Sequence, residues 1–150
     1  MAHALPVSPR TRARLDSTAR TASRRAYAPY SGFAVGAAVL AGSGKVYAGA
    51  NVENASYGLC NCAERTAIFH AIAQGESQIV AVAVYTPTAT PTLPCGACRQ
   101  VIREFGPRAT IRSTCKGSGH VETSLEALLP AAFGPEDLGK PAVRRRVTRR

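Results

Sequence analysis

Apolar residues are spaced along the chain in two ways, and each spacing predicts one kind of secondary structure. Apolar positions that recur every three or four residues predict helices over residues 9–29, 62–75 and 95–105. Apolar-rich runs predict strands over residues 33–40, 45–50, 79–85 and 109–114. Ser8 followed by Pro9 is typical of a helix start, and Thr123 or Ser124 is expected to cap a short helix over residues 124–129.

The order of these elements predicts the layers of the fold. The run over residues 79–85 is apolar with little alternation, as in a strand that is buried on both faces. Helices must then cover both faces, so we expect an α/β protein: a three-layer α/β/α sandwich with a mixed central sheet of about five strands. The length of 150 residues suits one domain, which we expect over residues 1–139, followed by a basic tail over residues 140–150.

The formal net charge is +10, but the positive charge lies at the two ends of the sequence. Residues 1–25 hold six arginines and one acidic residue, residues 140–150 hold six basic residues, and the stretch between is nearly neutral. Such ends are more typical of solvated tails than of a nucleic-acid site, so no nucleic-acid partner is expected. No run of about 20 apolar residues predicts a membrane span, and the start lacks a secretory pattern, which favours a cytoplasmic protein.

Three cysteines and a glutamate form the most informative motif. Cys62-Ala-Glu64 is followed, after 29 residues, by Pro94-Cys95-Gly-Ala-Cys98. Three thiolates select zinc among the common metal ions, and three protein ligands leave a fourth position open, as in catalytic sites. A carboxylate beside that position can act as general acid and base, and Glu64 is the candidate. The alternative is a structural site with four cysteines, in which Cys60 is the fourth ligand.

Local geometry limits where the two helices of this motif can begin. Residues two apart in a helix point in nearly opposite directions, so Cys62 and Glu64 can serve one site only if the helix begins beside Cys62. Helix N-termini at Cys62 and Cys95 would also favour the thiolate form. Because three thiolates outweigh the charge of Zn²⁺, Arg65 is a candidate to offset the excess by donating to a sulfur; the alternative is an ordinary surface arginine.

Four longer motifs surround these residues. They are Asn51-Val-Glu-Asn-Ala-Ser-Tyr57, Cys62-Ala-Glu-Arg-Thr-Ala-Ile68, Pro94-Cys-Gly-Ala-Cys-Arg-Gln-Val-Ile102 and Leu128-Leu-Pro-Ala-Ala-Phe133. In this order the motifs resemble those of the small homotetrameric cytidine deaminases, and the resemblance covers residues 27–138. It implies zinc-dependent hydrolysis of cytidine and 2′-deoxycytidine to uridine and 2′-deoxyuridine with release of ammonia, in pyrimidine salvage. Glu64 would protonate N3 of the base and then the departing amine.

The resemblance also implies which residues bind the nucleoside. Asn51 and Glu53 would hydrogen-bond the ribose, and Phe33 would pack against the pyrimidine. Tyr57 and Phe133 would lie at subunit junctions, in a homotetramer whose active sites are shared. The full substrate-binding set implied is Phe33, Asn51, Glu53, Ala55, Tyr57, Ala63 and Phe133. The residues alone leave two alternatives open, since Asn51 can also shape a turn and Phe33 can be a plain core residue.

Two other functions fit the zinc motif. One is deamination of cytosine in single-stranded nucleic acid, or of a modified cytosine nucleoside. A nucleic-acid channel needs positive charge and stacking aromatic residues, whereas the body of the chain is nearly neutral and the sequence has no tryptophan. The other is a zinc-stabilised binding module without activity. The resemblance favours an enzyme that acts on the free nucleoside.

Overall fold

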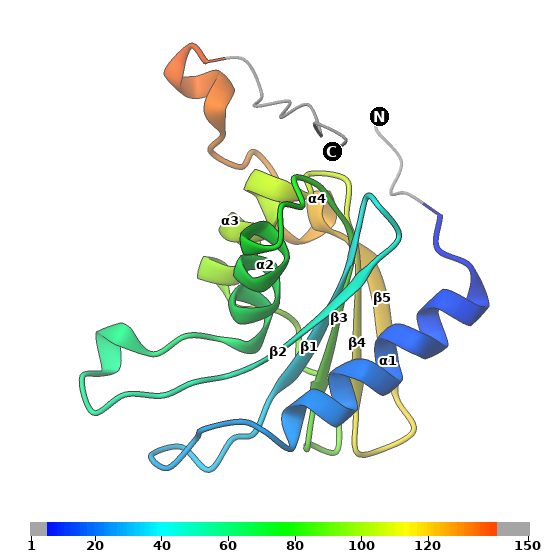
Figure 1. Ribbon diagram of the computed structural model, residues 1–150, viewed down its shortest axis with the longest axis vertical. Helices are drawn as coiled ribbons and strands as arrows, with labels where there is room; N and C mark the ends of the chain where they lie inside the picture. The colour runs from blue at the N-terminus through cyan, green and yellow to red at the C-terminus, as the bar shows by residue number, and fades with distance from the viewer. Residues whose placement is uncertain (1–5, 141–150) are drawn as a thin grey trace.

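The computed structural model describes residues 6–140 and contains one five-stranded sheet (Figure 1). The strands lie in the order β2-β1-β3-β4-β5, and only β3 and β4 run parallel to each other. The expected mixed sheet is therefore confirmed. The strands are β1 (Gly36–Ala41), β2 (Val46–Ala50), β3 (Ile79–Thr86), β4 (Thr110–Cys115) and β5 (His120–Ser124).

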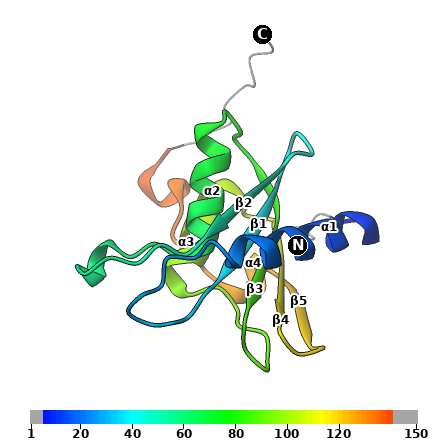
Figure 2. The ribbon, with the colours of Figure 1, turned by 60° about the horizontal axis from the view of Figure 1, so that its bottom comes forward.

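Helices cover both faces of this sheet, as expected for three layers (Figure 2). Helix α1 packs on one face, and α2, α3 and α4 pack on the other. None of the helices formed by residues 6–140 combines the length and hydropathy that a membrane span requires. The helices are α1 (Pro9–Ser23), α2 (Ala63–Ala73), α3 (Gly96–Phe105), α4 (Leu125–Leu128), and the short 3₁₀ helices η1 (Tyr57–Leu59) and η2 (Pro135–Leu138).

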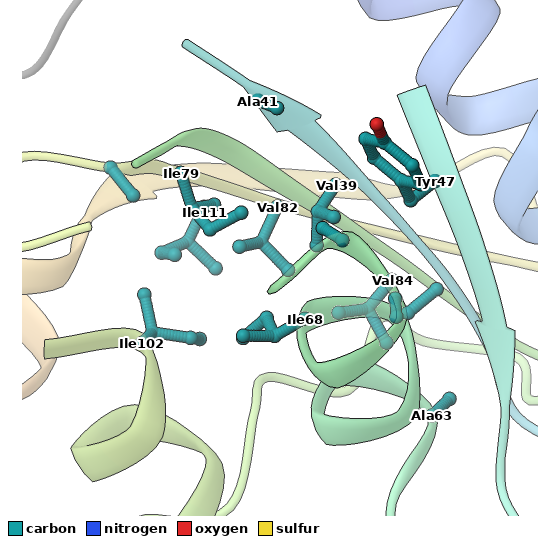
Figure 3. Packing of buried hydrophobic residues seen from close by; sticks show 14 of the residues in the cluster. Val39, Ala41, Tyr47, Ala63, Ile68, Ile79, Val82, Val84, Ile102 and Ile111 are labelled. Carbon is teal, nitrogen blue, oxygen red and sulfur yellow. The ribbon is translucent and has the colours of Figure 1, made fainter. Parts of the chain in front are cut away.

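The core explains why the β3 sequence shows little alternation. Val82 and Val84 of β3 face α2 and α3, where Ile68 and Ile102 pack against them (Figure 3). Ala81 and Ala83 of β3, which alternate with these valines, belong to a second, smaller cluster that includes residues of α1. A strand buried on both faces needs apolar residues at every position, so the interpretation of residues 79–85 is confirmed.

Glycine allows α2 to lie directly on β2. A Cβ atom built on Gly49 would stand 2.3 Å from the backbone nitrogen of Ala67 and 2.6 Å from the carbonyl oxygen of Ala63. Both distances are far below van der Waals contact, so a side chain at this position would collide with the helix backbone. Gly49 thus fixes the height of the first turn of α2 above the sheet.

Helix α1 differs from the sequence prediction at its end. It begins at Pro9 behind the Ser8 cap, as expected, but it ends at Ser23 and not near Pro29. Beyond it the backbone N–H of Tyr27 donates to the carbonyl of Asn51, 3.0 Å away, and Tyr27 forms a β-bridge with Val52. Extended pairing with the segment after β2 therefore replaces the helix in this region.

Strand β5 was not predicted, because its residues are exposed or half-buried and lack an apolar pattern. It forms by pairing with the outer edge of β4, along which Arg112 lies opposite Glu122 and Thr114 opposite His120. The short helix after it is confirmed, with Ser124 as its cap.

The arginines of residues 1–25 also differ from expectation. They lie on or directly after the packed helix α1 and not in a tail. The basic segment expected over residues 140–150 lies, apart from Lys140, outside the described residues.

Candidate active site

The N-termini of α2 and α3 bring three cysteine sulfurs together. Cys62 is the N-cap residue of α2, Cys95 is the N-cap residue of α3, and Cys98 lies in the first turn of α3. Neither sulfur caps its helix by accepting from a backbone N–H group of the first turn. The three sulfur atoms lie within 4.8 Å of one another, and those of Cys62 and Cys95 are 3.9 Å apart. The expected helix start beside Cys62 is thereby confirmed.

The sulfur spacing fits zinc. Two thiolates bound to a tetrahedral zinc ion at about 2.3 Å stand about 3.8 Å apart, which is close to the separation of Cys62 and Cys95. Among residues 6–140 no further His, Cys, Asp or Glu atom joins this group. Cys60 is bound elsewhere, because its sulfur accepts from the backbone N–H of Asn54 at 3.3 Å. The described residues therefore provide three ligands and not the four-cysteine alternative.

The electrostatics of the cluster favour negative sulfur. A hydrogen bond from Cys98 and the neighbouring Arg65 lower the pKa of Cys62 to about 5. The same hydrogen bond, together with burial, raises the pKa of Cys98, so Cys98 keeps its proton more readily than Cys62 does. A divalent cation can take the place of such a proton, because metal binding requires the deprotonated thiolates.

Arg65 reaches the cluster from the first turn of α2. Its Nη2 atom donates to the sulfur of Cys62 at 3.6 Å and to the carbonyl of Cys60 at 3.3 Å. The guanidinium is thus held against a thiolate, in the arrangement that would offset excess negative charge. The side chain is half-buried and does not resemble a freely solvated surface arginine.

Glu64 is buried beside the sulfurs. Its residue is 4% exposed although it lies in the first turn of a helix. Burial raises the pKa of its carboxyl group, and the negative charge of Cys62 adds to this effect. A carboxyl group holds a proton more firmly when its pKa is raised, and a group that can both take up and release a proton can serve as general acid and base.

A cleft of about 180 Å³ opens next to Glu64 and the cysteines. Of the substrate-binding residues implied by the sequence, Phe33, Asn51, Glu53 and Ala63 line it. Ala55, Tyr57 and Phe133 do not line it, and their residues are exposed in the single chain. The cleft is also lined by residues that sequence reasoning missed: Ser31, Val35, Val84, Thr86, Thr92 and Leu93.

Hydrogen bonds join the two segments that contribute Ser31, Phe33, Asn51 and Glu53 to the wall of the cleft. The carboxylate of Glu53 accepts from the backbone N–H groups of Tyr30 and Ser31, at 2.9 and 3.2 Å, and from the hydroxyl of Ser31. These bonds, with the Ser31 hydroxyl contributing most, lower the pKa of Glu53. The Ser31 hydroxyl in turn accepts from the N–H of Phe33 at 3.0 Å. The wall is therefore pre-formed around a charged carboxylate.

Asn51 fixes the same wall from the end of β2. Its side-chain oxygen accepts from the N–H of Val35 at 2.8 Å, and its side-chain nitrogen donates to the carbonyl of Phe33 at 2.9 Å. The amide thus shapes the backbone that carries Phe33, which was one of the alternatives left open by the residues. One hydrogen of its NH₂ group and one lone pair of its oxygen are free of these two bonds.

Comparison with known proteins shows the family. The family model described as the cytidine and deoxycytidylate deaminase zinc-binding region matches residues 9–114. A protein named cytidine deaminase from Sporosarcina psychrophila is 47% identical over 131 residues, which are 86% of this chain and 96% of that protein. Another of the same name, from Halalkalibacterium halodurans, is 52% identical over 114 residues, which are 75% of this chain and 86% of that protein.

Solved structures agree with the sequence relatives. The crystal structure of cytidine deaminase from Burkholderia pseudomallei has a TM-score of 0.79 and 51% identity, and the match covers 82% of this chain and 99% of that one. That of cytidine deaminase from Mycobacterium tuberculosis has a TM-score of 0.72 and 40% identity, covering 81% and 96%. The fold and the cysteine cluster define a zinc-binding deaminase domain. The chain belongs to the cytidine and deoxycytidylate deaminase family.

Proposed function

We propose that the protein is a cytidine deaminase that converts cytidine and 2′-deoxycytidine to uridine and 2′-deoxyuridine, with release of ammonia, in pyrimidine salvage. The observation that carries this proposal is a buried carboxyl group, Glu64, which lies beside three sulfurs spaced for zinc and lines a cleft. Five free cysteines are consistent with the reducing cytoplasm that we propose as its location.

Cys62, Cys95 and Cys98 would hold the metal. Zinc, when bound, supplies Lewis-acid activation of a water molecule for attack on carbon 4 of the pyrimidine. Arg65 would stabilise the thiolate of Cys62, to which it already donates. This donation withdraws charge from the sulfur and so limits the excess negative charge that three thiolates bring to the site.

Glu64 would move two protons in the reaction. It takes the first from the attacking water and delivers it to N3 of the cytosine ring. It takes the second from the new hydroxyl at carbon 4 and delivers it to the amino nitrogen. The bond between carbon 4 and that nitrogen then breaks, ammonia leaves, and a carbonyl forms at carbon 4. The raised pKa of Glu64 suits both transfers, because the carboxyl group must accept and release a proton within one turnover.

The wall of the cleft would bind the nucleoside. Phe33 offers its ring to the pyrimidine, and the backbone of Ala63, at the N-terminus of α2, offers a donor to the base. Glu53 and the free donor and acceptor of Asn51 would hydrogen-bond the ribose hydroxyls. Glu53 is already oriented by Tyr30 and Ser31, so little ordering would be required when the sugar binds.

We also propose a homotetramer with shared active sites. Tyr57 is 72% exposed, Leu59 is 70% exposed and Phe133 is 58% exposed, although all three are large and apolar. The segment that carries Ala55, Tyr57 and Leu59 extends away from the sheet (Figures 1 and 2). Exposed apolar residues grouped on an extended segment are typical of protein–protein contacts. In the tetramer, a neighbouring subunit would cover these exposed residues. Tyr57 and Phe133 of this chain would then lie at the active-site cleft of that neighbour.

The experiment is a deamination assay on the purified, zinc-analysed protein. Loss of the cytidine absorbance band should accompany ammonia release, and Glu64→Gln should retain zinc while turnover falls at least about 100-fold. Glu104→Gln, which changes an exposed glutamate on α3, is the matched control and should keep full activity. A Glu64→Gln protein with undiminished turnover would refute the mechanism. Faster deamination of a cytosine-containing oligonucleotide or of a modified cytosine nucleoside than of cytidine would refute the substrate.

A further inference from the structure

Helix α1 leaves part of its own face of the sheet uncovered. Its buried residues Leu15 and Ala19 pack on β1 and β3 and stop short of β4 and β5. A cleft of about 390 Å³ lies between α1 and the hairpin that joins β4 to β5, which are seen together in Figure 1. It is lined by polar residues of both: Asp16, Ser17, Arg20, Arg112, Thr114, Ser118 and His120, with Cys115 and two glycines.

Two guanidinium groups of this cleft are held in fixed positions. The Nε atom of Arg112 donates to both carboxylate oxygens of Asp16, at 3.1 and 2.9 Å, and its Nη1 atom donates to Glu122 at 3.3 Å. Arg20 lies over the ring of Tyr85, with 4.9 Å between its guanidinium carbon and the ring centroid. No carboxylate within residues 6–140 forms an ion pair with Arg20. Its charge is therefore available to a ligand.

The hairpin that joins β4 to β5 adds hydrogen-bond donors to the cleft. Residues 116–120 are all exposed and read Lys116-Gly-Ser-Gly-His120. Gly117 and Gly119 line the cleft with backbone alone, and Ser118 between them supplies a hydroxyl in addition to that of Ser17 on α1. Backbone N–H groups in glycine-rich turns and serine hydroxyls are frequent partners of anions.

The charge of the lining indicates the ligand. Among the residues that the structure describes, Asp16 is the one carboxylate that lines the cleft, and its charge is neutralised by Arg112. The charge of Arg20 therefore makes the lining positive, and Lys116 adds a further positive charge nearby. A tetrahedral oxyanion with several acceptor oxygens matches the guanidinium of Arg20, the N–H groups of Arg112 that Asp16 and Glu122 leave unused, and two hydroxyls. We propose that this cleft is a second binding site, for a phosphate group supplied by inorganic phosphate or by a nucleotide.

This site would be separate from the zinc cleft. The two clefts share no lining residue, and α1 lies on the opposite face of the sheet from α2 and α3. Binding here would thus be independent of the proposed deaminase activity. A cleft of about 390 Å³ also has room for more than a single phosphate group, which allows a nucleotide to enter.

The test is calorimetric titration of the full chain at constant ionic strength with inorganic phosphate, adenosine 5′-monophosphate and adenosine. Arg20→Gln should weaken phosphate binding about tenfold or more. Arg14→Gln is the matched control, because Arg14 is exposed on the same helix but does not line the cleft, and it should change binding less than about twofold. Ser118→Glu, on the exposed hairpin, should abolish binding through charge repulsion. All three variants should keep the zinc content and cytidine turnover of the unaltered protein.

Different outcomes identify the source of the phosphate or overturn the proposal. Equal affinity for inorganic phosphate and the nucleotide indicates free phosphate, whereas much tighter nucleotide binding indicates contacts beyond the phosphate. The proposal would be overturned if adenosine bound saturably and the two phosphate compounds did not. It would also be overturned if neither inorganic phosphate nor adenosine 5′-monophosphate bound saturably. Equal losses in Arg20→Gln and Arg14→Gln would also overturn it, because they would show diffuse attraction to a basic helix.

Discussion

Substitution of Gly49 by alanine tests how the sheet positions the zinc site. The added Cβ atom would stand 2.3 Å from the nitrogen of Ala67, 2.6 Å from the oxygen of Ala63 and 2.8 Å from the Cα atom of Ala67. Ordinary contacts of a carbon atom begin near about 3.4 Å, so the first turns of α2 must retreat by about 1 Å. The contacting atoms are helix backbone, which cannot move aside as the end of a flexible side chain could.

The displacement has two calculable consequences. Overpacking of this kind costs about 1–3 kcal/mol of the free energy of unfolding. The same shift moves Cys62 and Glu64, which begin α2, relative to Cys95 on α3. The 3.9 Å between the sulfurs of Cys62 and Cys95 leaves little tolerance for tetrahedral zinc. A misplacement of about 1 Å in a reacting group costs about 100-fold in rate.

The assay combines urea denaturation, zinc content and kcat/KM for cytidine. Gly119→Ala is the control, because among the described residues a Cβ atom there would meet nothing closer than Pro91, at 3.4 Å. Gly119 lies in the hairpin between β4 and β5, apart from the three cysteines of the zinc cluster. We expect Gly49→Ala to lose stability, zinc and activity together, and the control to lose none of them. A Gly49→Ala protein with the stability, zinc content and kcat/KM of the unaltered protein would refute the claim that this contact positions the site.

Three further predictions concern the metal, the cleft wall and the chain after α4. Removal of zinc by a chelator should abolish deamination and lower the melting temperature of the protein. Added zinc should restore the activity and the melting temperature. Activity that persists in metal-free protein would exclude a zinc mechanism. Ser31→Ala should raise the KM for cytidine several-fold while kcat changes little, because Glu53 loses the hydroxyl that orients it. Ser31→Thr, which keeps a hydroxyl, should restore the KM. A fall in kcat alone would contradict this role of Ser31. Ala131 has a φ of +51°, the one positive value outside glycine in residues 6–140. Ala131→Gly should therefore raise the free energy of unfolding by up to about 1 kcal/mol, whereas Ala132→Gly should lower it by a similar amount. Equal effects of the two substitutions in urea denaturation would show that the backbone at Ala131 is not strained.

The sequence predicted the structure best where a physical requirement could be met by only one arrangement of the chain. Cys62 and Glu64 can serve a single site only if the helix begins beside Cys62, and α2 begins at Ala63. The apolar run of β3 had to be a central strand, because no other position buries both faces. Zinc followed from three thiolates, two of which, Cys95 and Cys98, are spaced for one face of a first helical turn.

Elements that depend on partners distant in sequence were not predictable in this way. Helix α1 was expected to continue to Pro29, but Tyr27 pairs with residues after β2, and local pattern carries no information on that pairing. Strand β5 is held by the edge of β4 and has no apolar face of its own. Ser31 reaches Glu53 across 22 residues of sequence, so neither a motif nor a spacing indicated their contact.

The central claim is that three cysteines hold zinc and leave one position open beside Glu64. X-ray absorption at the zinc edge of the purified protein measures this directly. We predict three sulfur neighbours at about 2.3 Å and one oxygen or nitrogen neighbour at about 2.0 Å. A shell of four sulfur atoms would place Cys60 or another cysteine on the metal, close the open position, and contradict the proposed chemistry.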